Sequence, residues 1–343
     1  MKRINFGLLG TAGIAGRSVI EPAEKSDAVT VYAVASRSLE KAAAFAHTYS
    51  IPCFFEGYDA LLQCREVDAI YIPLINSLHA EYTIKAIEAG KHVLVEKPMC
   101  LNARDADRIA ACCKDHPQIV VLEGLMSQHH PFNGGLKAMV DGREYGALQS
   151  ISTRACYTID KPDDFRLFPE KGGSVFFDEG LLWCHLTQLC IGLHPVAFDA
   201  HCDFNGPHGG DHTFQASLTF PNGVTSAVFC SLAHPYQADH VLEFEKAVVT
   251  VKNFWRPTFG KQKLTVEIAQ PNAPEAVRRV FEPQNYFSNQ LAFFSDVIQG
   301  KTDNVPITDS LERIKIMEKI FHSAKGKSTR HESQDHTVGS PSA

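Results

Sequence analysis

The sequence of 343 residues predicts an α/β protein: a doubly wound parallel sheet, followed by an α+β domain with an open, mostly antiparallel sheet. Three observations carry this prediction. Short apolar runs alternate with helical patterns as far as about residue 125, which is typical of a parallel sheet. The first of these runs ends in a turn of small residues. In the second half of the chain, after about residue 125, strands with alternating apolar and polar residues dominate, separated by glycine and proline.

Composition describes an ordinary globular chain, with 44% hydrophobic and 21% charged residues. The formal net charge of -6 gives no support for a nucleic-acid or membrane partner. No apolar run approaches the ~20 residues of a membrane span, and the start lacks the apolar region of a signal peptide. The ten cysteines show no CxxC spacing. We therefore expect reduced thiols in a cytoplasmic protein.

The first apolar run, Ile4 to Leu9, leads into Gly10-Thr11-Ala12-Gly13-Ile14-Ala15-Gly16. Strand, small-residue turn and helix form the Rossmann-type arrangement, in which the helix N-terminus meets a pyrophosphate. Ala12 and Ala15 stand where a GxGxxG pattern has its second and third glycines. The turn alone predicts either a dinucleotide site or a tight connection without a ligand.

The next predicted strand, Val29 to Ala35, ends in Ser36-Arg37-Ser38. A site that prefers NAD carries an acidic residue near this point, and this chain has none. A hydroxyl and a guanidinium suit a ribose 2′-phosphate, so the sequence favours NADP, with NAD as the alternative. A serine here could instead only cap the following helix.

The alternation then continues, with helices expected at 39–49, 58–64, 76–89 and 102–113, and strands at 67–72, 92–95 and 119–123. The strand at 92–95 delivers Glu96-Lys97-Pro98. Ligands of doubly wound sheets lie beyond the carboxyl ends of the strands. Because proline biases Lys97 toward an extended backbone, its ammonium group can point at a substrate oxygen. The alternative is a solvated lysine.

In the second half, strands are expected at 148–157, 213–220, 224–232, 241–244, 247–251 and 264–268. An open sheet of this kind has a large apolar face, which predicts a homodimer or homotetramer through the C-terminal sheet. Helices follow at 285–299 and 308–323. The predicted domains are 1–125 and 126–324, with the helix at 305–324 returning to the first domain, and a disordered polar tail at 325–343.

Arg166 lies in a polar loop of this second domain. It is a candidate for binding a substrate oxygen because a guanidinium can donate to two oxygens at once; the alternative is an exposed loop arginine. Tyr157 and Trp183 either shape the substrate pocket or belong to the core. The cluster of histidine, cysteine and aspartate between 201 and 212 fits no structural zinc spacing, so no metal is expected.

Taken together and in order, several motifs between Gly7 and Pro131 resemble the Gfo/Idh/MocA oxidoreductase family, nearest its dihydrodiol dehydrogenase-like and glucose–fructose oxidoreductase-like members. The motifs are Gly10 to Ala15, Ala35-Ser36-Arg37, Ile72 to His79, Glu88 to Pro98, Glu123 and His130-Pro131. The resemblance implies cofactor contacts at Gly10, Thr11, Ala12, Ile14, Ser36, Arg37, Pro73, Asn76, His79, Glu96 and Lys97. Asn76 and His79 also have plain alternatives, a helix N-cap and a surface histidine.

The resemblance extends to the helix around Asp178. Family members carry an aspartate there and, one helical turn later, a histidine or tyrosine that exchanges a proton with the substrate. Asp178 matches, with a helix N-cap as its plain alternative. Leu182 stands at the second position and cannot move a proton. His185, seven residues after Asp178 on roughly the same helix face, is the candidate substitute, or else a buried structural histidine. Lys97 could also serve as the acid unaided.

These expectations define an NADP-dependent dehydrogenase or reductase. It would move a hydride between nicotinamide and a secondary alcohol or carbonyl of a sugar, polyol, cyclic diol or similar small molecule. Lys97 would polarise the oxygen, Asp178 would orient the substrate or Lys97, and His185 would relay a proton. Leu182 keeps a non-redox alternative open: a lyase, hydrolase or biosynthetic cyclase on the same scaffold. A non-catalytic NADP-responsive protein is a third hypothesis, which the presence of Lys97 and Asp178 together disfavours.

Overall fold

The structure is a computed structural model that describes residues 3–335. It divides into two compact units. The first takes in the chain as far as Asn133, together with 255–263 and 281–314, and the second takes in the remaining residues. The sequence therefore leaves the first unit and returns to it twice.

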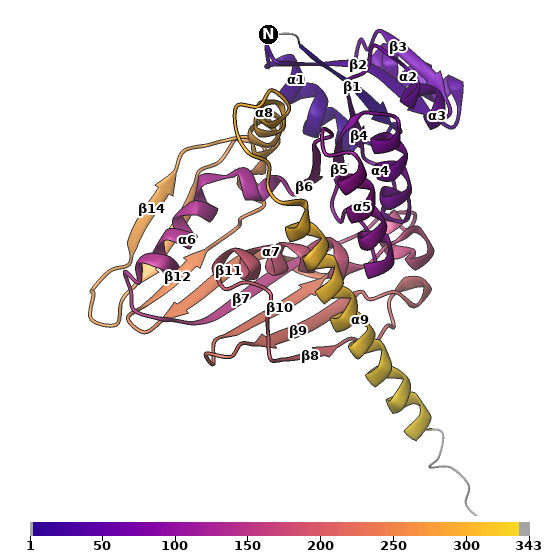
Figure 1. Cartoon of the computed structure of the whole chain (residues 1–343). Coiled ribbons are helices and arrows are strands. Elements are labelled where there is room, and N and C mark those ends of the chain that lie inside the picture. Colours follow the sequence, from indigo (N-terminus) through magenta and orange to yellow (C-terminus); the bar gives the residue numbers. More distant parts are fainter. Residues whose placement is uncertain (1–2, 336–343) are drawn as a thin grey trace, which may run out of the picture. The chain divides into compact units, whose positions relative to one another are not determined.

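The first unit contains a six-stranded sheet in the order β3-β2-β1-β4-β5-β6, in which all neighbours run parallel (Figure 1). This confirms the predicted doubly wound sheet. The strands are β1 (Ile4–Leu9), β2 (Val29–Ser36), β3 (Cys53–Glu56), β4 (Ala69–Ile72), β5 (His92–Glu96) and β6 (Val121–Gly124). The order changes direction between β1 and β4, and dinucleotides bind in the crevice beyond such a crossover.

Helices follow the first five strands of this unit in turn, and a further helix joins the unit from later in the chain. They are α1 (Glu21–Glu24), α2 (Leu39–Thr48), α3 (Tyr58–Leu62), α4 (His79–Glu88), α5 (Ala103–Asp115) and α8 (Tyr286–Ile298). A wide π-helical turn, η1 (Gly16–Ile20), leads into α1. The core is apolar, and Phe294 of α8 packs edge-to-face on Phe6 of β1 with ring centroids 5.7 Å apart. Burial of these faces drives the helices onto the sheet.

The second unit contains an eight-stranded sheet in the order β14-β13-β12-β11-β7-β10-β9-β8. Its strands are β7 (Leu148–Thr158), β8 (Ala197–His201), β9 (Thr213–Thr219), β10 (Thr225–Ser231), β11 (Ala233–Phe244), β12 (Ala247–Val251), β13 (Leu264–Ala269) and β14 (Val277–Phe281). β7 and β10 pair in parallel, while other neighbours such as β11 and β7 pair antiparallel. The expected open, mostly antiparallel sheet is therefore confirmed.

Helix α7 (Leu181–Cys190) and the π-helical turn η6 (Phe176–Gly180) before it pack on β7 and β10. The strand residues on that face, such as Ile151, Val228 and Leu242, are buried. Residues on the opposite face, such as Ser152 and Val248, are exposed. This sheet therefore has an inner face covered by its own helix and an outer face that this unit leaves open.

Two helices connect the units or end the chain. Helix α6 (Pro131–Gly142) spans the boundary between them, and α9 (Ile307–Asp335) contributes its residues up to Ile314 to the first unit. α9 is longer than the helix expected at 308–323 and covers part of the tail expected to be disordered; residues 336–343 lie outside the described chain. No helix in the described part of the chain is long and apolar enough to cross a membrane.

Candidate active site

The turn after β1 carries the first group of predicted cofactor residues. Gly10 has a φ of +94°, in the left-handed region that glycine enters without strain. A Cβ atom at this position would come within 3.0 Å of Leu74 Cδ2, in the loop after β4. Thr11 and Ala12 follow outside any regular element, and the helical run begins at Ile14. A bare glycine backbone that leads into a helix at the sheet crossover fits the pyrophosphate of a dinucleotide.

The end of β2 lies next to this turn, because Gly10 N–H donates to Ala35 O at 2.8 Å. Ser36 is buried and Arg37 is exposed. The N-cap of α2 is Ser38, whose Oγ accepts Lys41 N–H at 3.3 Å. The capping role that the sequence left open is therefore filled by Ser38, while Ser36 Oγ accepts Ser38 N–H at 3.5 Å.

The turn after β5 holds Glu96 and Lys97, both half-buried. The Tyr71 hydroxyl donates to Glu96 Oε1 at 2.5 Å, and Ser18 Oγ lies 2.7 Å from the Tyr71 oxygen. Burial, and then the negative charge of Glu96, raise the pKa of Tyr71 well above its usual value, so this phenol stays a donor. Tyr71 and Ser18 thus fix the carboxylate beside Lys97, and sequence analysis identified neither.

The turn is held from its other side by a buried carboxylate. Glu123 of β6 accepts Met99 N–H at Oε1, 2.9 Å away, and Arg313 Nη2 donates to its Oε2 at 2.7 Å. Both charged side chains are almost completely buried, at 1% and 2% exposed. A Cβ atom on Gly124 would come within 3.0 Å of Val95 O, so β6 and β5 approach closely where the turn begins. The backbone around Lys97 is therefore tightly constrained.

His79 joins this turn to the loop after β4. Its Nδ1 lies 2.7 Å from Pro98 O and its Nε2 lies 2.9 Å from Leu74 O. The side chain is completely buried, so His79 is not a surface histidine. Pro73 and Asn76 are buried in the same loop. The structure thus brings Gly10, the loop after β4 and the turn after β5 together at the carboxyl edge of one sheet.

In the second unit, the structure pairs two predicted residues. Arg166 Nε donates to Asp178 Oδ2 at 2.6 Å, and Arg166 Nη1 lies 3.3 Å from Asp164 Oδ1. The carboxylate charge of Asp178 raises the pKa of Arg166 above its usual value, against the effect of burial. Tyr157 lies at the end of β7, near the same carboxylates. Burial raises its pKa well above the usual value, and the negative charges of Glu179 and Asp178 raise it further. The Nε–H group of Arg166 is therefore hydrogen-bonded to Asp178 and does not face a ligand.

Asp178 lies within the π-helical turn η6, and an aspartate from elsewhere anchors the start of that turn. Asp211 Oδ2 accepts from Ser174 Oγ at 2.7 Å and from Phe176 N–H at 2.9 Å. Burial raises the pKa of Asp211 from its usual value to about 7. Sequence analysis considered Asp211 only as part of a possible metal cluster. The structure gives it a positioning role for the segment that carries Asp178.

The neighbours of Asp178 in sequence are deeply buried. Leu182 is 4% exposed and His185 is 9% exposed. Trp183 has no exposed surface, and its indole N–H donates to Ser226 Oγ at 2.7 Å, which is the environment of a core residue. The π-helical turn bonds residues five apart, so a spacing of seven no longer guarantees the common face expected for Asp178 and His185.

The residues between 201 and 212 do not converge. His208 stacks on Phe168 with ring centroids 4.2 Å apart, and His201 pairs with Asp203 at 3.2 Å. Among the described residues, no group of three or more histidines, cysteines, aspartates or glutamates could hold a metal ion.

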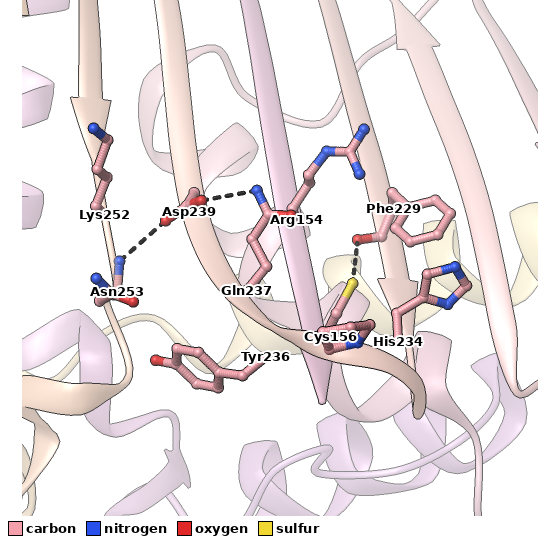
Figure 2. A pocket seen from close by; sticks show the side chains of 10 residues that line it. Arg154, Cys156, Phe229, His234, Tyr236, Gln237, Asp239, Lys252 and Asn253 are labelled. Atoms are coloured by element: carbon pink, nitrogen blue, oxygen red, sulfur yellow. Dashed lines mark hydrogen bonds between the residues drawn. The ribbon is translucent and has the colours of Figure 1, made fainter. Parts of the chain in front are cut away.

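A pocket of about 390 Å³ lies in the second unit, on the outer face of the sheet (Figure 2). Asp239 stands in it and accepts from Gln237 Nε2 at 2.9 Å and from Asn253 N–H at 3.1 Å. The other lining residues are Arg154, Cys156, Phe229, His234, Pro235, Tyr236 and Lys252. None of them carries a role predicted from the sequence, so this pocket is separate from the candidate catalytic residues of its unit.

The first sheet has a small-residue turn at its crossover, and Lys97 lies after β5 on a turn whose backbone is held by hydrogen bonds. These two features are typical of a dinucleotide-dependent oxidoreductase. Residues 4–123 match the model of the oxidoreductase family with an NAD-binding Rossmann fold, GFO_IDH_MocA, and residues 135–245 match the C-terminal domain of the same family. The chain belongs to the Gfo/Idh/MocA family, as the sequence motifs indicated. It is an NAD(P)-dependent oxidoreductase acting on CH–OH or C=O groups.

Named relatives cover nearly the whole chain. A dTDP-3,4-didehydro-2,6-dideoxy-alpha-D-glucose 3-reductase of Streptomyces violaceoruber is 30% identical over 87% of this chain and 86% of its own length. A D-xylose 1-dehydrogenase (NADP(+)) of Haloferax volcanii is 28% identical over 93% and 97%. The crystal structure of KijD10, a 3-ketoreductase from Actinomadura kijaniata in complex with NADP and TDP-benzene, superposes with a TM-score of 0.85 at 25% identity, covering 94% and 98%.

Proposed function

We propose that this chain is an NADP-dependent dehydrogenase or reductase. It moves a hydride between nicotinamide and a secondary alcohol or carbonyl of a sugar, polyol, cyclic diol or similar small molecule. The observation that carries the proposal is Lys97 on a turn fixed by Glu123 and His79 at the carboxyl edge of the sheet. The similar proteins with named activities support it, because they reduce a keto sugar or oxidise xylose.

The dinucleotide is bound along the carboxyl edge of the first sheet. Gly10, Thr11, Ala12 and Ile14 receive its pyrophosphate on backbone groups, and Ser36 with Arg37 receives the 2′-phosphate. Positions 36–39, directly where β2 ends, contain no acidic residue. Pro73, Asn76, His79 and Glu96 shape the nicotinamide side. An NADP(+) enzyme and an NADP complex among the similar proteins support this preference.

Bound NADP supplies the hydride chemistry, and the protein residues supply orientation and the proton. The Lys97 ammonium group donates to the substrate oxygen, which polarises a carbonyl for reduction. Asp178, held by Arg166, orients the substrate or Lys97. His185 relays the proton. Tyr157 and the remaining Arg166 donors line the substrate side, and Trp183 supports this helix from the core.

The non-redox alternative rested on Leu182 at the expected proton-transfer position. The similar proteins with named activities are reductases and dehydrogenases, and nothing in them supports a lyase, hydrolase or cyclase. Redox chemistry therefore remains the proposal.

We also propose a cytoplasmic homodimer or homotetramer assembled through the outer face of the second sheet. All ten cysteines are free thiols, as expected in a reducing compartment. The outer face exposes Val248, at 40%, and carries the pocket of Figure 2. A second copy on this face would cover a surface of mixed polar and apolar side chains that the unit itself leaves open.

The function is tested by screening keto sugars, aldoses, polyols and cyclic diols with NADPH or NADP, following the absorbance of reduced nicotinamide. Lys97→Ala should lower kcat on the substrate found by about 100-fold or more, with the Kd for NADPH changed less than about twofold. Lys114→Ala, an exposed lysine of α5, is the matched control and should leave kcat unchanged. An unchanged kcat in Lys97→Ala would remove Lys97 from the mechanism.

A further inference from the structure

Tyr58 lies beside the proposed 2′-phosphate site without having been assigned to it. β3 ends where its Glu56 pairs with Ser36 of β2, and Gly57 N–H donates to Ser36 O at 2.8 Å. α3 begins with the next residue, Tyr58 (Figure 1). The register of two strands therefore places this tyrosine next to Ser36 and Arg37.

The Tyr58 hydroxyl lies close to the glycine turn after β1. A Cβ atom built on Gly10 would lie 3.9 Å from the Tyr58 oxygen. The positive charge of Arg37 lowers the pKa of Tyr58, although burial has the larger effect and raises it. The Tyr58 oxygen therefore lies close to the turn after β1, and Tyr58 is near enough to Arg37 for that charge to act on it.

A second aromatic ring packs on the Tyr58 ring, while the Tyr58 hydroxyl makes no hydrogen bond to the described part of the protein. Tyr82 of α4 packs edge-to-face on Tyr58, with ring centroids 5.0 Å apart and an interplanar angle of 88°. Lys85 Nζ lies 4.8 Å from the centroid of Tyr82 and pairs with Glu81 at 2.9 Å. Within the described part of the chain, no protein group hydrogen-bonds the Tyr58 hydroxyl. The donor is thus held in place with its bonding capacity unused.

We propose that the Tyr58 hydroxyl donates a hydrogen bond to the 2′-phosphate of NADP and, together with Arg37, makes the enzyme prefer NADP over NAD. The proposal rests on the NADP preference given above. A phosphate monoester carries a charge of about -1.5 to -2 at neutral pH and three strong acceptor oxygens, so it can accept from a guanidinium and a phenol together. NAD offers only a hydroxyl there, which gains far less from the same donor.

The experiment compares Tyr58→Phe with the wild-type enzyme in fluorescence titrations with NADPH and NADH. The variant keeps the ring and removes the donor. We expect the Kd for NADPH to rise about tenfold, as for one charge-assisted hydrogen bond, and the Kd for NADH to stay within about twofold. Tyr82→Phe is the matched control, since it removes the neighbouring hydroxyl and should change neither Kd. Melting temperatures establish that all three proteins are folded.

A second measurement uses adenosine 2′,5′-bisphosphate and AMP as competitors, which isolates the phosphate from the nicotinamide. Tyr58→Phe should weaken only the bisphosphate. Equal weakening of NADPH and NADH would place the hydroxyl on a group that both cofactors share and overturn the proposal, and so would an unchanged NADPH affinity. A wild-type enzyme that binds NADH as tightly as NADPH would instead overturn the NADP preference itself, and with it the role of Tyr58.

Discussion

Arg166 donates from Nε to Oδ2 of Asp178 at 2.6 Å, and the receiving carboxylate is 3% exposed. A buried charge is tolerated when it is paired and hydrogen-bonded, and Arg166 provides both. The arginine was expected to bind substrate directly. Because Arg166 Nε donates to Asp178, the arginine orients this aspartate, and only its other nitrogen atoms remain to contact substrate.

Removing Arg166 should therefore affect catalysis more than cofactor binding. Arg166→Ala leaves Asp178 without its partner, and we expect kcat to fall by about 10- to 100-fold with the Kd for NADPH unchanged. Arg166→Lys keeps the charge but not the planar donor geometry, so its kcat should lie between those of Arg166→Ala and the wild type. Steady-state kinetics measure both, and Lys161→Ala, an exposed lysine of the same loop, serves as control. A full kcat in Arg166→Ala would show that Asp178 needs no such support.

His185 is the proposed proton relay. His185→Gln should lower kcat by about 100-fold, because an amide cannot accept and pass on a proton as imidazole can. His194→Gln, at an exposed position after α7, should leave kcat unchanged. If His185→Gln lowers only the melting temperature, the histidine is structural, and Lys97 is left to act as the acid alone.

Asp211 predicts a pH dependence of stability. Burial raises its pKa to about 7, whereas the unfolded chain releases this proton at about pH 4. Between these values the folded state holds a proton that the unfolded state has lost, so the free energy of unfolding falls as the pH rises, by at most about 1.4 kcal/mol per pH unit. Above about pH 7 this contribution is constant.

Asp211→Asn should flatten that slope, since the amide can still accept Phe176 N–H and does not titrate. Urea unfolding across about pH 4 to 8 measures it, with Asp163→Asn, an exposed carboxylate, as control. An identical slope in Asp211→Asn and the wild type would show that another group titrates.

The buried pair of Arg313 and Glu123 should be costly to break. Arg313→Met leaves Glu123 charged and buried, and we expect the free energy of unfolding to fall by about 3–5 kcal/mol. Adding Glu123→Gln should recover part of this, because the buried charge is removed and an acceptor for Met99 N–H remains. Arg108→Met, which breaks the exposed pair with Asp105, should cost about 1 kcal/mol or less. Denaturant titrations measure the free energy of unfolding of each variant. Equal losses in Arg313→Met and Arg108→Met would show that the buried pair is no more costly to break than the exposed one.

The outer face of the second sheet should govern assembly. Val248→Lys places a charge on the proposed interface and should shift the protein toward the 37.9 kDa monomer in analytical ultracentrifugation. Leu39→Lys replaces a similarly exposed apolar residue of the first unit and should leave the mass unchanged. A wild-type monomer, or a variant oligomer of full size, would exclude this face as the interface.

The two sheets could be predicted because their central strands carry strong patterns. Buried parallel strands such as β4 and β5 read as apolar runs, and the central antiparallel strands of the second unit alternate. The edge strands β3, β8 and β14 were missed. Apart from the buried Ala200, their residues are half-exposed or exposed, so no buried face imposes a period on the sequence.

The support of the site could not be read in the same way. Glu123 and Arg313 are 190 residues apart, and Asp211 reaches Ser174 across 37 residues. Hydrogen bonds of this kind are set by tertiary packing and leave no local period. The π-helical turn at Asp178 is also invisible to a count that assumes regular helical spacing. Motif order found the family, while the partners that hold its residues needed the fold.

The return of the chain to its first unit has a consequence during synthesis. A ribosome releases Glu123 long before it has made Arg313, and α8, whose Phe294 completes the core over β1, also arrives late. The nascent first unit must therefore remain without the cationic partner of Glu123 and without α8 until residues 281–314 have been translated. Chaperones that hold emerging chains should matter more for this protein than for one whose cofactor domain is continuous in sequence.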